Sequence, residues 1–250
     1  MGNVAWDFSE KVVAITGSAV GMGAGAVASF ARARATVYGL DIDASAGEKV
    51  AADTATRFLL CDITDRAQVG AAFAQIGAES GKLDVLINNA GGFWEQLTTE
   101  ATSEEEWDRV VDLNLKGVFL CSQEAVALLR GSTAGRIITL GSLAGQTTMY
   151  RSSPPYAAAK AGVMALSRVL AYELAGDGIT CNVIAPSAVL TDRILQVRGT
   201  AERAATQATI PLGRYGNVDD IVHWMMFLAS DESGYMTGQT VTVNGGRFMS

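Results

Sequence analysis

The sequence predicts an α/β protein with one doubly wound, seven-stranded parallel sheet and helices on both of its faces. Seven short apolar runs recur along the chain, helical segments separate them, and a glycine-rich turn follows the first run. Strands that are apolar over their whole length are typical of a parallel sheet that is covered on both faces. The chain has 250 residues, 49% of them hydrophobic, and no linker or low-complexity stretch, so we expect a single domain over residues 1–250.

The predicted strands and helices alternate in chain order. The strands are expected at 11–16, 35–41, 56–62, 83–90, 135–142, 178–186 and 239–244, and the helical segments between them include 26–34, 65–77, 104–130 and 154–175. The segment from Ser187 to Arg214 breaks this alternation because it is long, polar and without a strand. Long insertions after a strand often serve as lids, so we expect a substrate lid over 187–214. A pair of surface helices is the alternative.

The charge and hydropathy of the chain argue against several kinds of partner. It has 19 basic residues against 26 acidic ones, a net charge of -7, and no basic cluster. We therefore expect neither nucleic acid nor an anionic membrane as a partner. No apolar run is as long as a membrane span, and the first residues do not resemble a signal peptide, so we expect a cytoplasmic location.

Cysteine and histidine usage argues against metal chemistry and against a histidine base. Cys61, Cys121 and Cys181 are widely spaced, with no second cysteine or histidine nearby, so we expect buried thiols and no metal. His223, the only histidine, lies in an apolar run and is expected to be packed or at an interface. A catalyst in this chain must therefore use a different general base.

The glycine-rich turn indicates a dinucleotide site. The first predicted strand runs into TGSAVGMGAG, which contains Gly17, Gly21, Met22 and Gly23. Glycine permits positive φ and close backbone approach, and a helix that follows at once offers free N–H groups to a pyrophosphate. The position of the turn between a strand and a helix therefore favours a bound nucleotide over a simple loop.

The second predicted strand ends at an acidic residue that bears on cofactor choice. Asp41 lies 18 residues beyond Gly23, no arginine or lysine occupies positions 17–24, and Ile42 follows. A carboxylate about 20 residues on can accept the ribose hydroxyls of NAD and would repel the 2′-phosphate of NADP. We therefore expect Asp41 and Ile42 to border the adenosine ribose of NAD. The alternative is that Asp41 merely starts a turn.

The stretch YAAAK at residues 156–160 indicates acid/base chemistry. Tyr156 and Lys160 are four residues apart, so their polar groups converge on one helix face. A phenol titrates near ~10 and is a poor base unless positive charge stabilises the phenolate. Lys160 and an oxidised nicotinamide supply that charge, so Tyr156 could take an alcohol proton while hydride leaves carbon. Ser142, at the end of the fifth predicted strand, could hydrogen-bond the same substrate oxygen.

Taken together, TGSAVGMG, NNAG at 88–91 and YAAAK resemble the short-chain dehydrogenase/reductase family over essentially the whole chain. The resemblance implies a Rossmann domain with Ser142, Tyr156 and Lys160 as catalytic residues and Asn114 holding a proton-relay water. Further cofactor-binding residues that it implies are Asp62, Ile63, Asn89, Ala90, Gly91, Pro186, Val189 and Thr191. Taken singly, the serine could be a helix cap, the asparagine a packing amide, the tyrosine a core aromatic and the lysine a solvated charge.

Two departures from the family pattern bear on the substrate side. Ser187 follows Pro186 where the family usually has glycine, and the separation of 14 residues between Ser142 and Tyr156 is one longer than expected. Expected substrate-lining residues are Phe93, Trp94, Leu143, Met149, Tyr150, Leu190 and Leu195. Their apolar and aromatic character favours an aromatic, alicyclic or aliphatic ketone or secondary alcohol. Arg151 and Arg193 could instead pair with an anionic substrate.

These observations predict an NAD(H)-dependent oxidoreductase that interconverts a secondary alcohol and a ketone. An NADPH-dependent ketoreductase is one alternative. A catalytically silent dinucleotide sensor is another, but a sensor needs only the cofactor half, whereas Ser142, Tyr156 and Lys160 are all present.

The predicted helix within DDIVHWMMFLAS bears on assembly. Its apolar residues, Trp224 among them, surround almost the whole circumference, so we expect a partner subunit to cover it. The long helices around Asn114 and Tyr156 would supply a second self-complementary surface, which predicts a homotetramer. The alternative is that the last residues, NGGRFMS, fold over the helix within one subunit.

Overall fold

A computed structural model describes residues 5–148, 152–197 and 199–249. Its strands are β1 (Val12–Thr16), β2 (Thr36–Asp41), β3 (Arg57–Leu60), β4 (Val85–Asn88), β5 (Arg136–Leu140), β6 (Thr180–Pro186) and β7 (Thr240–Val243). All of them pair in parallel within one sheet, in the order β3-β2-β1-β4-β5-β6-β7. The predicted seven-stranded parallel sheet is therefore confirmed.

The strand order contains one reversal of direction. The chain builds outward from β1 to β3 and then returns to place β4 on the other side of β1. Ligands of such sheets bind outside the carboxyl ends of the strands at this switch point. The loops that follow Thr16 and Asn88 lie there, side by side.

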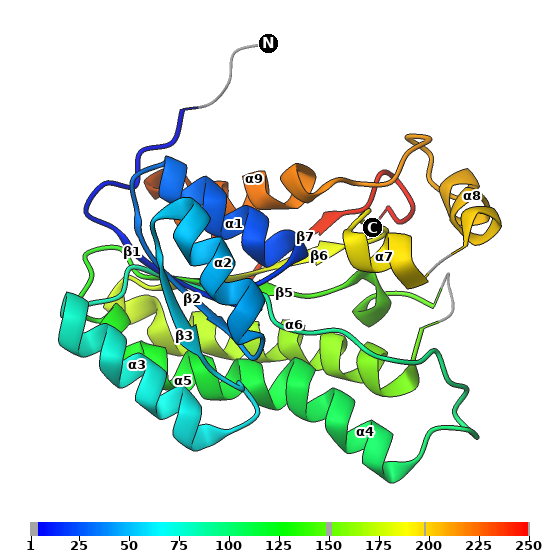
Figure 1. Cartoon of the computed structure of the whole chain (residues 1–250), viewed down its shortest axis with the longest axis horizontal. Coiled ribbons are helices and arrows are strands. Elements are labelled where there is room, and N and C mark those ends of the chain that lie inside the picture. Colours follow the sequence, from blue (N-terminus) through cyan, green and yellow to red (C-terminus); the bar gives the residue numbers. More distant parts are fainter. Residues whose placement is uncertain (1–4, 149–151, 198, 250) are drawn as a thin grey trace.

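Alternate residues of each strand feed two separate cores. Val12, Ala14 and Leu86 point to one face, and Val13 and Ile15 point to the other. This alternation explains why the strands are apolar over their whole length, because both faces are covered by helices. Figure 1 shows the two helical layers, with α1, α2 and α9 on one side of the sheet and α3, α5 and α6 on the other.

The helices follow the predicted segments closely, with additions. They are α1 (Gly21–Arg32), α2 (Ala44–Thr54), α3 (Arg66–Ser80), α4 (Glu104–Val111), α5 (Gly117–Leu129), α6 (Pro154–Leu174), α7 (Asp192–Val197), α8 (Thr200–Ala208) and α9 (Val218–Ala229). A π-helical turn, η1 (Asp112–Lys116), joins α4 to α5, and short 3-10 turns are η2 (Leu143–Gly145), η3 (Ala175–Asp177) and η4 (Asp231–Ser233). The predicted helix over 104–130 is thus interrupted at its middle.

Helix α2 was not expected from the pattern because it contributes little apolar surface. Gly47 is its one buried residue, and a Cβ there would lie 2.0 Å from the Phe58 ring. The helix therefore packs on β3 through its backbone. Asp43 caps it, since its carboxylate accepts a hydrogen bond from the Ala46 N–H at 3.0 Å.

The expected lid segment contains helices rather than an irregular loop. Within 187–214 lie α7 and α8, and Val189 forms an isolated bridge with Gly216. The alternative, a pair of surface helices, therefore describes its structure. Figure 1 places α7 and α8 at one end of the sheet, beside the last strands. A lid role for these helices stays a prediction.

The packing of α9 differs from the expectation that a partner must cover it. Ile221, Val222 and Met225 are buried within the subunit, against α1 and the sheet. Trp224 and Phe227 are half-buried and meet edge to face with centroids 5.7 Å apart, and His223 is exposed. The layer formed with α1 is what covers most of the apolar circumference.

Two further expectations concern the C-terminal segment and the three cysteines. Gly245 and Gly246 of the final residues pack on the segment 210–212, and the alternative that these residues fold over α9 stays a prediction. The three cysteines are free and buried, as predicted. Burial raises the pKa of Cys61 to about 11 and that of Cys181 to about 12, which makes these thiols poor nucleophiles.

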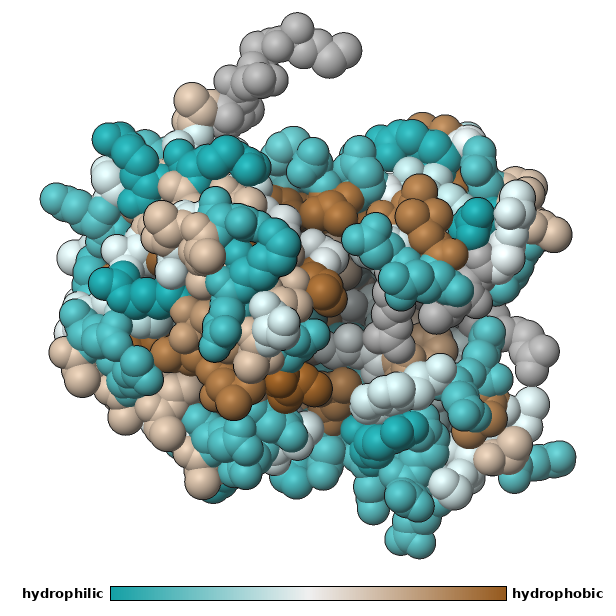
Figure 2. Space-filling model, viewed as in Figure 1, coloured by the Kyte–Doolittle hydropathy of each residue, from teal (hydrophilic) through white to brown (hydrophobic). Residues whose placement is uncertain are grey.

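One face of the molecule carries both hydrophilic and apolar zones. Figure 2 shows apolar side chains gathered along the middle of one face, between hydrophilic zones above and below. Within the described ranges, no helix combines the length and the apolar character that crossing a membrane requires.

Candidate active site

The glycine turn is tied to the end of β4 by Thr16 and Asn89. The Thr16 hydroxyl accepts hydrogen bonds from the backbone N–H groups of Asn89 and Ala90, both at 3.1 Å. The Asn89 amide in turn donates to the carbonyls of Thr16 at 3.0 Å and Gly17 at 2.9 Å. The expected cofactor residues Asn89 and Ala90 therefore hold the two loops of the switch point together.

The glycines of the turn are required by geometry. Gly17 has a φ of +65°, and a Cβ on Gly23 would lie 1.9 Å from the Gly17 carbonyl oxygen. Gly21 has a φ of +58° and lies opposite the Thr191 methyl group, at 3.7 Å from an ideal Cβ. Any side chain at Gly23 would force the turn open, so its compact shape depends on glycine.

Helix α1 begins without a side-chain cap, which fits an anionic ligand. The cap position, Val20, makes no side-chain hydrogen bond, and the first turn has no acidic residue. Side chains cap α2, α3, α4 and α9, whereas α6 and α8, like α1, begin without a side-chain cap. Free N–H groups at the start of a helix of this length bind a pyrophosphate well, so the residues present fit a dinucleotide.

Asp41 lies at the end of β2 with its carboxylate beside the glycine turn. One of its oxygens accepts a hydrogen bond from the Ala19 N–H at 2.9 Å, and the other accepts one from the Asp43 N–H at 3.0 Å. Asp41 therefore does stabilise a turn, as the alternative interpretation held, but this does not occupy its whole carboxylate. Each carboxylate oxygen has a second lone pair, so both remain able to accept ribose hydroxyls. The neighbouring Ile42 side chain is exposed.

The loop after β3 offers one polar group and one buried side chain. The Asp62 carboxylate accepts hydrogen bonds from the Thr64 N–H and hydroxyl, both at 2.8 Å, which holds it in a fixed position. Ile63 is buried, and its side chain packs closely on Gly117 at the start of α5. The Ile63 side chain therefore supports the scaffold, and only its backbone is left for a ligand.

Helix α6 carries Tyr156 and Lys160 on one face, as predicted. The Lys160 ammonium lies 5.6 Å from the centre of the Tyr156 ring. It donates a hydrogen bond to the Leu140 carbonyl at 2.7 Å, and the side chain of this lysine is only 3% exposed. Desolvation lowers the pKa of Lys160 to about 8. The solvated-charge alternative for this lysine is therefore wrong.

Ser142 is brought to the same helix by η2. Its hydroxyl oxygen accepts a hydrogen bond from the Ala144 N–H at 3.1 Å, so it does cap this short turn. A Cβ on Gly145 would lie 2.6 Å from the backbone of Lys160 and Ala161. Gly145, which the motifs did not single out, therefore lets the serine turn contact α6 backbone to backbone. A glycine three residues after the serine was the available signal.

Asn114 lies in the π-helical turn and is completely buried. Its amide donates hydrogen bonds to the carbonyls of Gly92 at 2.7 Å and Val110 at 2.8 Å, and its oxygen accepts one from the Gly92 N–H at 2.9 Å. The carboxamide thus clamps the loop after NNAG. A Cβ on Gly91 would meet both the Asn114 oxygen, at 2.7 Å, and the Lys160 ammonium, at 3.2 Å.

The segment after β6 faces the glycine turn. Pro186 and Val189 are buried, and Thr191 lies opposite Gly21, so the residues expected near the nicotinamide approach the phosphate turn. At the departure from the family pattern, the Ser187 hydroxyl accepts a hydrogen bond from the Arg247 guanidinium at 2.9 Å. This contact to the C-terminal tail had no signal in the sequence because the two residues are 60 positions apart.

The expected substrate residues have different positions. The Phe93 ring packs on the Tyr156 ring with centroids 4.8 Å apart, and Trp94, Leu190 and Leu195 are exposed. Leu143 has no exposed surface, so it belongs to the packing beneath the site and its expected contact with substrate lacks support. Met149 and Tyr150, with Arg151, lie outside the described residues, as does part of the longer loop before Tyr156.

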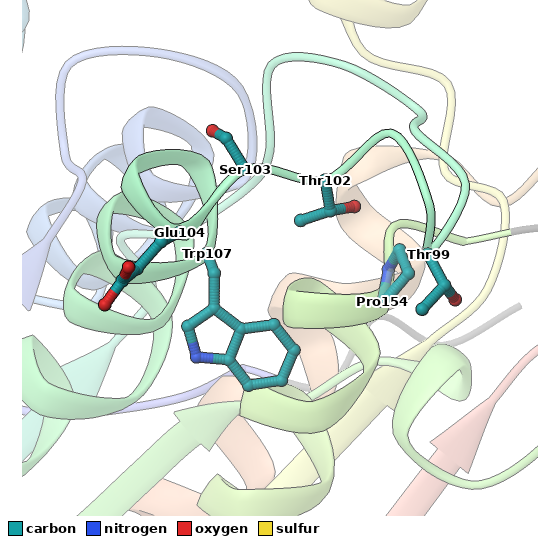
Figure 3. A pocket seen from close by; sticks show the side chains of 6 residues that line it. All are labelled: Thr99, Thr102, Ser103, Glu104, Trp107 and Pro154. Atoms are coloured by element: carbon teal, nitrogen blue, oxygen red, sulfur yellow. The ribbon is translucent and has the colours of Figure 1, made fainter.

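A separate shallow pocket opens next to the start of α6. Figure 3 shows the Trp107 indole on one side of it and Pro154 with Thr99 on the other. Its volume of about 250 Å³ is below the roughly 300–1,000 Å³ of ordinary ligand sites. Neither the glycine turn nor Tyr156 lines it, so this pocket is not the candidate active site.

The fold and the site define a nicotinamide-dependent oxidoreductase built on a doubly wound sheet. A family model described as "Enoyl-(Acyl carrier protein) reductase" matches residues 17–247. The chain belongs to the short-chain dehydrogenase/reductase family, whose members bind a nicotinamide dinucleotide. The resemblance noted in the sequence is thereby confirmed.

Relatives and solved structures agree with this assignment. The chain is 35% identical to "3-oxoacyl-[acyl-carrier-protein] reductase FabG" of Escherichia coli (strain K12) over 97% of its own length and 99% of that protein. The protein of the same name from Thermotoga maritima is also 35% identical, over 94% and 97% of the two chains. The structures titled "Crystal structure of gox2181" and a short-chain type dehydrogenase/reductase from Mycobacterium ulcerans both have a TM-score of 0.92. They are 29% and 27% identical, cover 96% of this chain each, and are themselves covered to 96% and 90%.

The burial of the Lys160 charge predicts that its removal stabilises the folded protein. In the absence of cofactor, Lys160→Met should raise the free energy of unfolding at pH 7 by about 1–3 kcal/mol, because a lowering of the lysine pKa from 10.5 to about 8 corresponds to roughly 3 kcal/mol. Below pH 8 the ammonium is charged in both states and the full penalty applies. As pH rises from 8 to 10.5 only the unfolded state keeps the proton, so the penalty, and with it the gain of the variant, disappears.

Urea unfolding of both proteins at pH 7 and pH 10 measures this difference. The three cysteine thiols contribute equally to the wild type and the variant, so their titration cancels in the difference between the two free energies of unfolding. Lys49→Met, at an exposed lysine paired with Asp53, is the control and should change stability by less than about 0.5 kcal/mol at either pH. A Lys160→Met protein that is less stable than wild type at pH 7 would contradict the prediction.

Proposed function

We propose that the protein is an NAD(H)-dependent oxidoreductase that interconverts a secondary alcohol and a ketone, with Tyr156 as general acid/base. The observation that carries the proposal is the convergence of three groups on one turn of α6. Lys160 is buried against the end of β5, Tyr156 lies one turn before it, and the Ser142 turn packs on the same backbone through Gly145. A dinucleotide sensor has no use for this arrangement.

The chemistry divides between the bound cofactor and the side chains of this chain. The nicotinamide, when bound, accepts or supplies the hydride. Ser142 has its oxygen fixed by the Ala144 N–H, which leaves its own hydrogen to donate to the substrate oxygen. Tyr156 gives a proton to that oxygen in reduction and takes it in oxidation, and the Lys160 charge favours the phenolate.

The relatives favour ketone reduction as the direction. The relatives described above are named as reductases of 3-oxoacyl groups, which carry a ketone. Phe93, on the Tyr156 ring, gives the substrate side an apolar wall, which suits the carbon skeleton of a ketone better than a free anion. The proposed substrate class is therefore a ketone with an apolar substituent, or the corresponding secondary alcohol.

The geometry of Asp41 supports NAD over NADP. Its carboxylate is fixed by the Ala19 and Asp43 N–H groups at the end of β2, where the adenosine ribose passes in this fold. A fixed negative charge repels a 2′-phosphate, and the neighbouring Ile42 supplies no compensating cation. NADPH-dependent reduction remains the second candidate because the named relatives are reductases.

Tyr156→Phe should lower turnover by ~100-fold or more and leave the affinity for NADH within about twofold, because only the transferred proton is lost. Steady-state rates with a panel of ketones and alcohols, in the presence of each cofactor, measure turnover, and fluorescence titration measures NADH binding. Tyr235→Phe is the control, since this tyrosine is fully exposed and lies in none of the proposed sites. Near wild-type turnover by Tyr156→Phe would refute the mechanism.

Cofactor preference should reverse with charge at the end of β2. Wild type should have the higher kcat/KM with NAD(H), and Asp41→Ala combined with Ile42→Arg should shift the preference toward NADP(H). Asp43→Ala removes a neighbouring carboxylate that caps α2 and should leave the preference unchanged. A wild-type preference for NADP(H) would overturn this part of the proposal, as would an equal shift in the Asp43 variant.

We further propose that the assembly is a homotetramer and keep the cytoplasmic location as a prediction from the sequence. Phe119 on α5 and Val169 and Tyr172 on α6 are exposed apolar residues, which supports a contact surface there. Light scattering at micromolar concentration should give about four times the chain mass. Trp224→Glu should also yield smaller species, because it would place a desolvated charge at the proposed contact through α9. A stable wild-type monomer would refute the assembly and leave the site unaffected.

A further inference from the structure

The loop after β4 forms an aromatic wall that is clamped from both sides. Its first clamp is Asn114, whose carboxamide makes two hydrogen bonds with the Gly92 backbone, at 2.7 and 2.9 Å. The next residue, Phe93, packs its ring on Tyr156 with an angle of 53° between the planes. The direction in which the chain leaves Gly92 therefore decides where this ring meets the proposed general acid.

The second clamp acts on Trp94, the residue after Phe93. The Arg109 guanidinium lies over the Trp94 ring, 3.8 Å from its centre, in a cation–π contact. The Trp94 side chain is 50% exposed and would have several rotamers open to it without this cover. Arg109 comes from α4, so the contact ties the loop to a helix.

Arg109 is itself fixed by Glu106, one turn earlier on α4. Its Nε and Nη2 groups both donate to the same Glu106 oxygen, the first at 3.0 Å. The Glu106 side chain is 10% exposed, and its other oxygen is buried with no hydrogen-bond partner among the described residues. A carboxylate so placed requires its one cation, so Arg109 is held in position and its charge is neutralised.

This neutralisation decides what the wall can recognise. An arginine that is already paired with a buried carboxylate is a weak receptor for an anionic substrate. The apolar groups that this loop offers are instead its two aromatic rings, one packed on Tyr156 and the other covered by Arg109. Rigid aromatic surfaces bind flat or bulky apolar groups and discriminate by shape.

We propose that Arg109, acting through Trp94, is a specificity-determining positioning residue that fixes the Phe93–Trp94 wall for ketones and alcohols with a bulky, flat apolar substituent. The inference rests on the proposed oxidoreductase function. It adds Glu106 and Arg109 to the substrate side, where Trp94 was already expected, and none of these three side chains acts on the reacting atoms. The wall should therefore affect the KM of bulky substrates and not the chemical step.

Steady-state kinetics with acetophenone and with acetone separates these effects. Arg109→Met should raise KM for acetophenone about tenfold, which is about 1.4 kcal/mol, while kcat, the KM for NADH and the KM for acetone stay within about twofold. Arg109→Lys keeps a cation over the ring and should restore most of the affinity. Arg130→Met is the matched control, because Arg130 is similarly exposed and paired with Asp177 on another part of the surface.

Two further measurements keep the proposal falsifiable. Arg109→Met leaves Glu106 unpaired and could unfold the helix, so the double variant Glu106→Gln with Arg109→Met removes the stranded charge and should show the same selective rise in KM. The difference in emission between each protein and its Trp94→Phe counterpart reports on Trp94 alone and should move to longer wavelength without Arg109.

The outcomes are distinct. Equal losses for acetophenone and acetone, a changed KM for NADH, or no change in either substrate would overturn the positioning role. If wild type reduces neither ketone with either cofactor, the proposed function fails instead, and the Trp94 emission still tests the stack. An unshifted emission in Arg109→Met would overturn the proposal whatever the kinetics show.

Discussion

The burial of the Lys160 ammonium is the constraint on which the candidate site depends. A cation that is 3% exposed has lost most of its water, and the Leu140 carbonyl at 2.7 Å supplies the hydrogen bond that remains. That bond exists only if α6 lies against the carboxyl end of β5. Gly145 allows this approach by omitting a side chain where the two backbones touch. The same packing places the Tyr156 ring 5.6 Å from the cation and the Ser142 turn against the backbone of Lys160.

The other end of the site is the glycine turn, where the backbone N–H groups at the start of α1 have no side-chain cap. Helix α1 lacks the side-chain cap that α2, α3, α4 and α9 have, and Thr16 and Asn89 hold its glycine turn against the next loop. Uncapped N–H groups are unfavourable unless a ligand or water satisfies them. A dinucleotide would therefore satisfy an existing deficit at one end and lie near a buried positive charge at the other.

Pattern and motif sufficed for those parts of the molecule in which local sequence determines the structure. The seven strands followed from apolar runs, and the pairing of Tyr156 with Lys160 followed from helical spacing. Helix α2 did not, because it packs through Gly47 and has few apolar residues to reveal it. The apolar circumference of α9 pointed to a partner, whereas α1 covers most of it, since a pattern shows that burial is needed and not which surface provides it.

Contacts between distant segments were the least predictable part. The Arg247–Ser187 hydrogen bond, the Arg109–Trp94 stack and the close approach at Gly145 each join residues that no motif links. Two of these three lie on the substrate side, and the reason is physical. The cofactor and the proton-transfer groups are held by strand ends and by α6, whose geometry the sheet dictates. The substrate wall stands on a loop, so its shape depends on whichever side chains reach it from elsewhere, here Asn114 and Arg109. Chains with the same three motifs can therefore share the chemistry and differ in substrate. Residues outside those motifs determine which substrate binds.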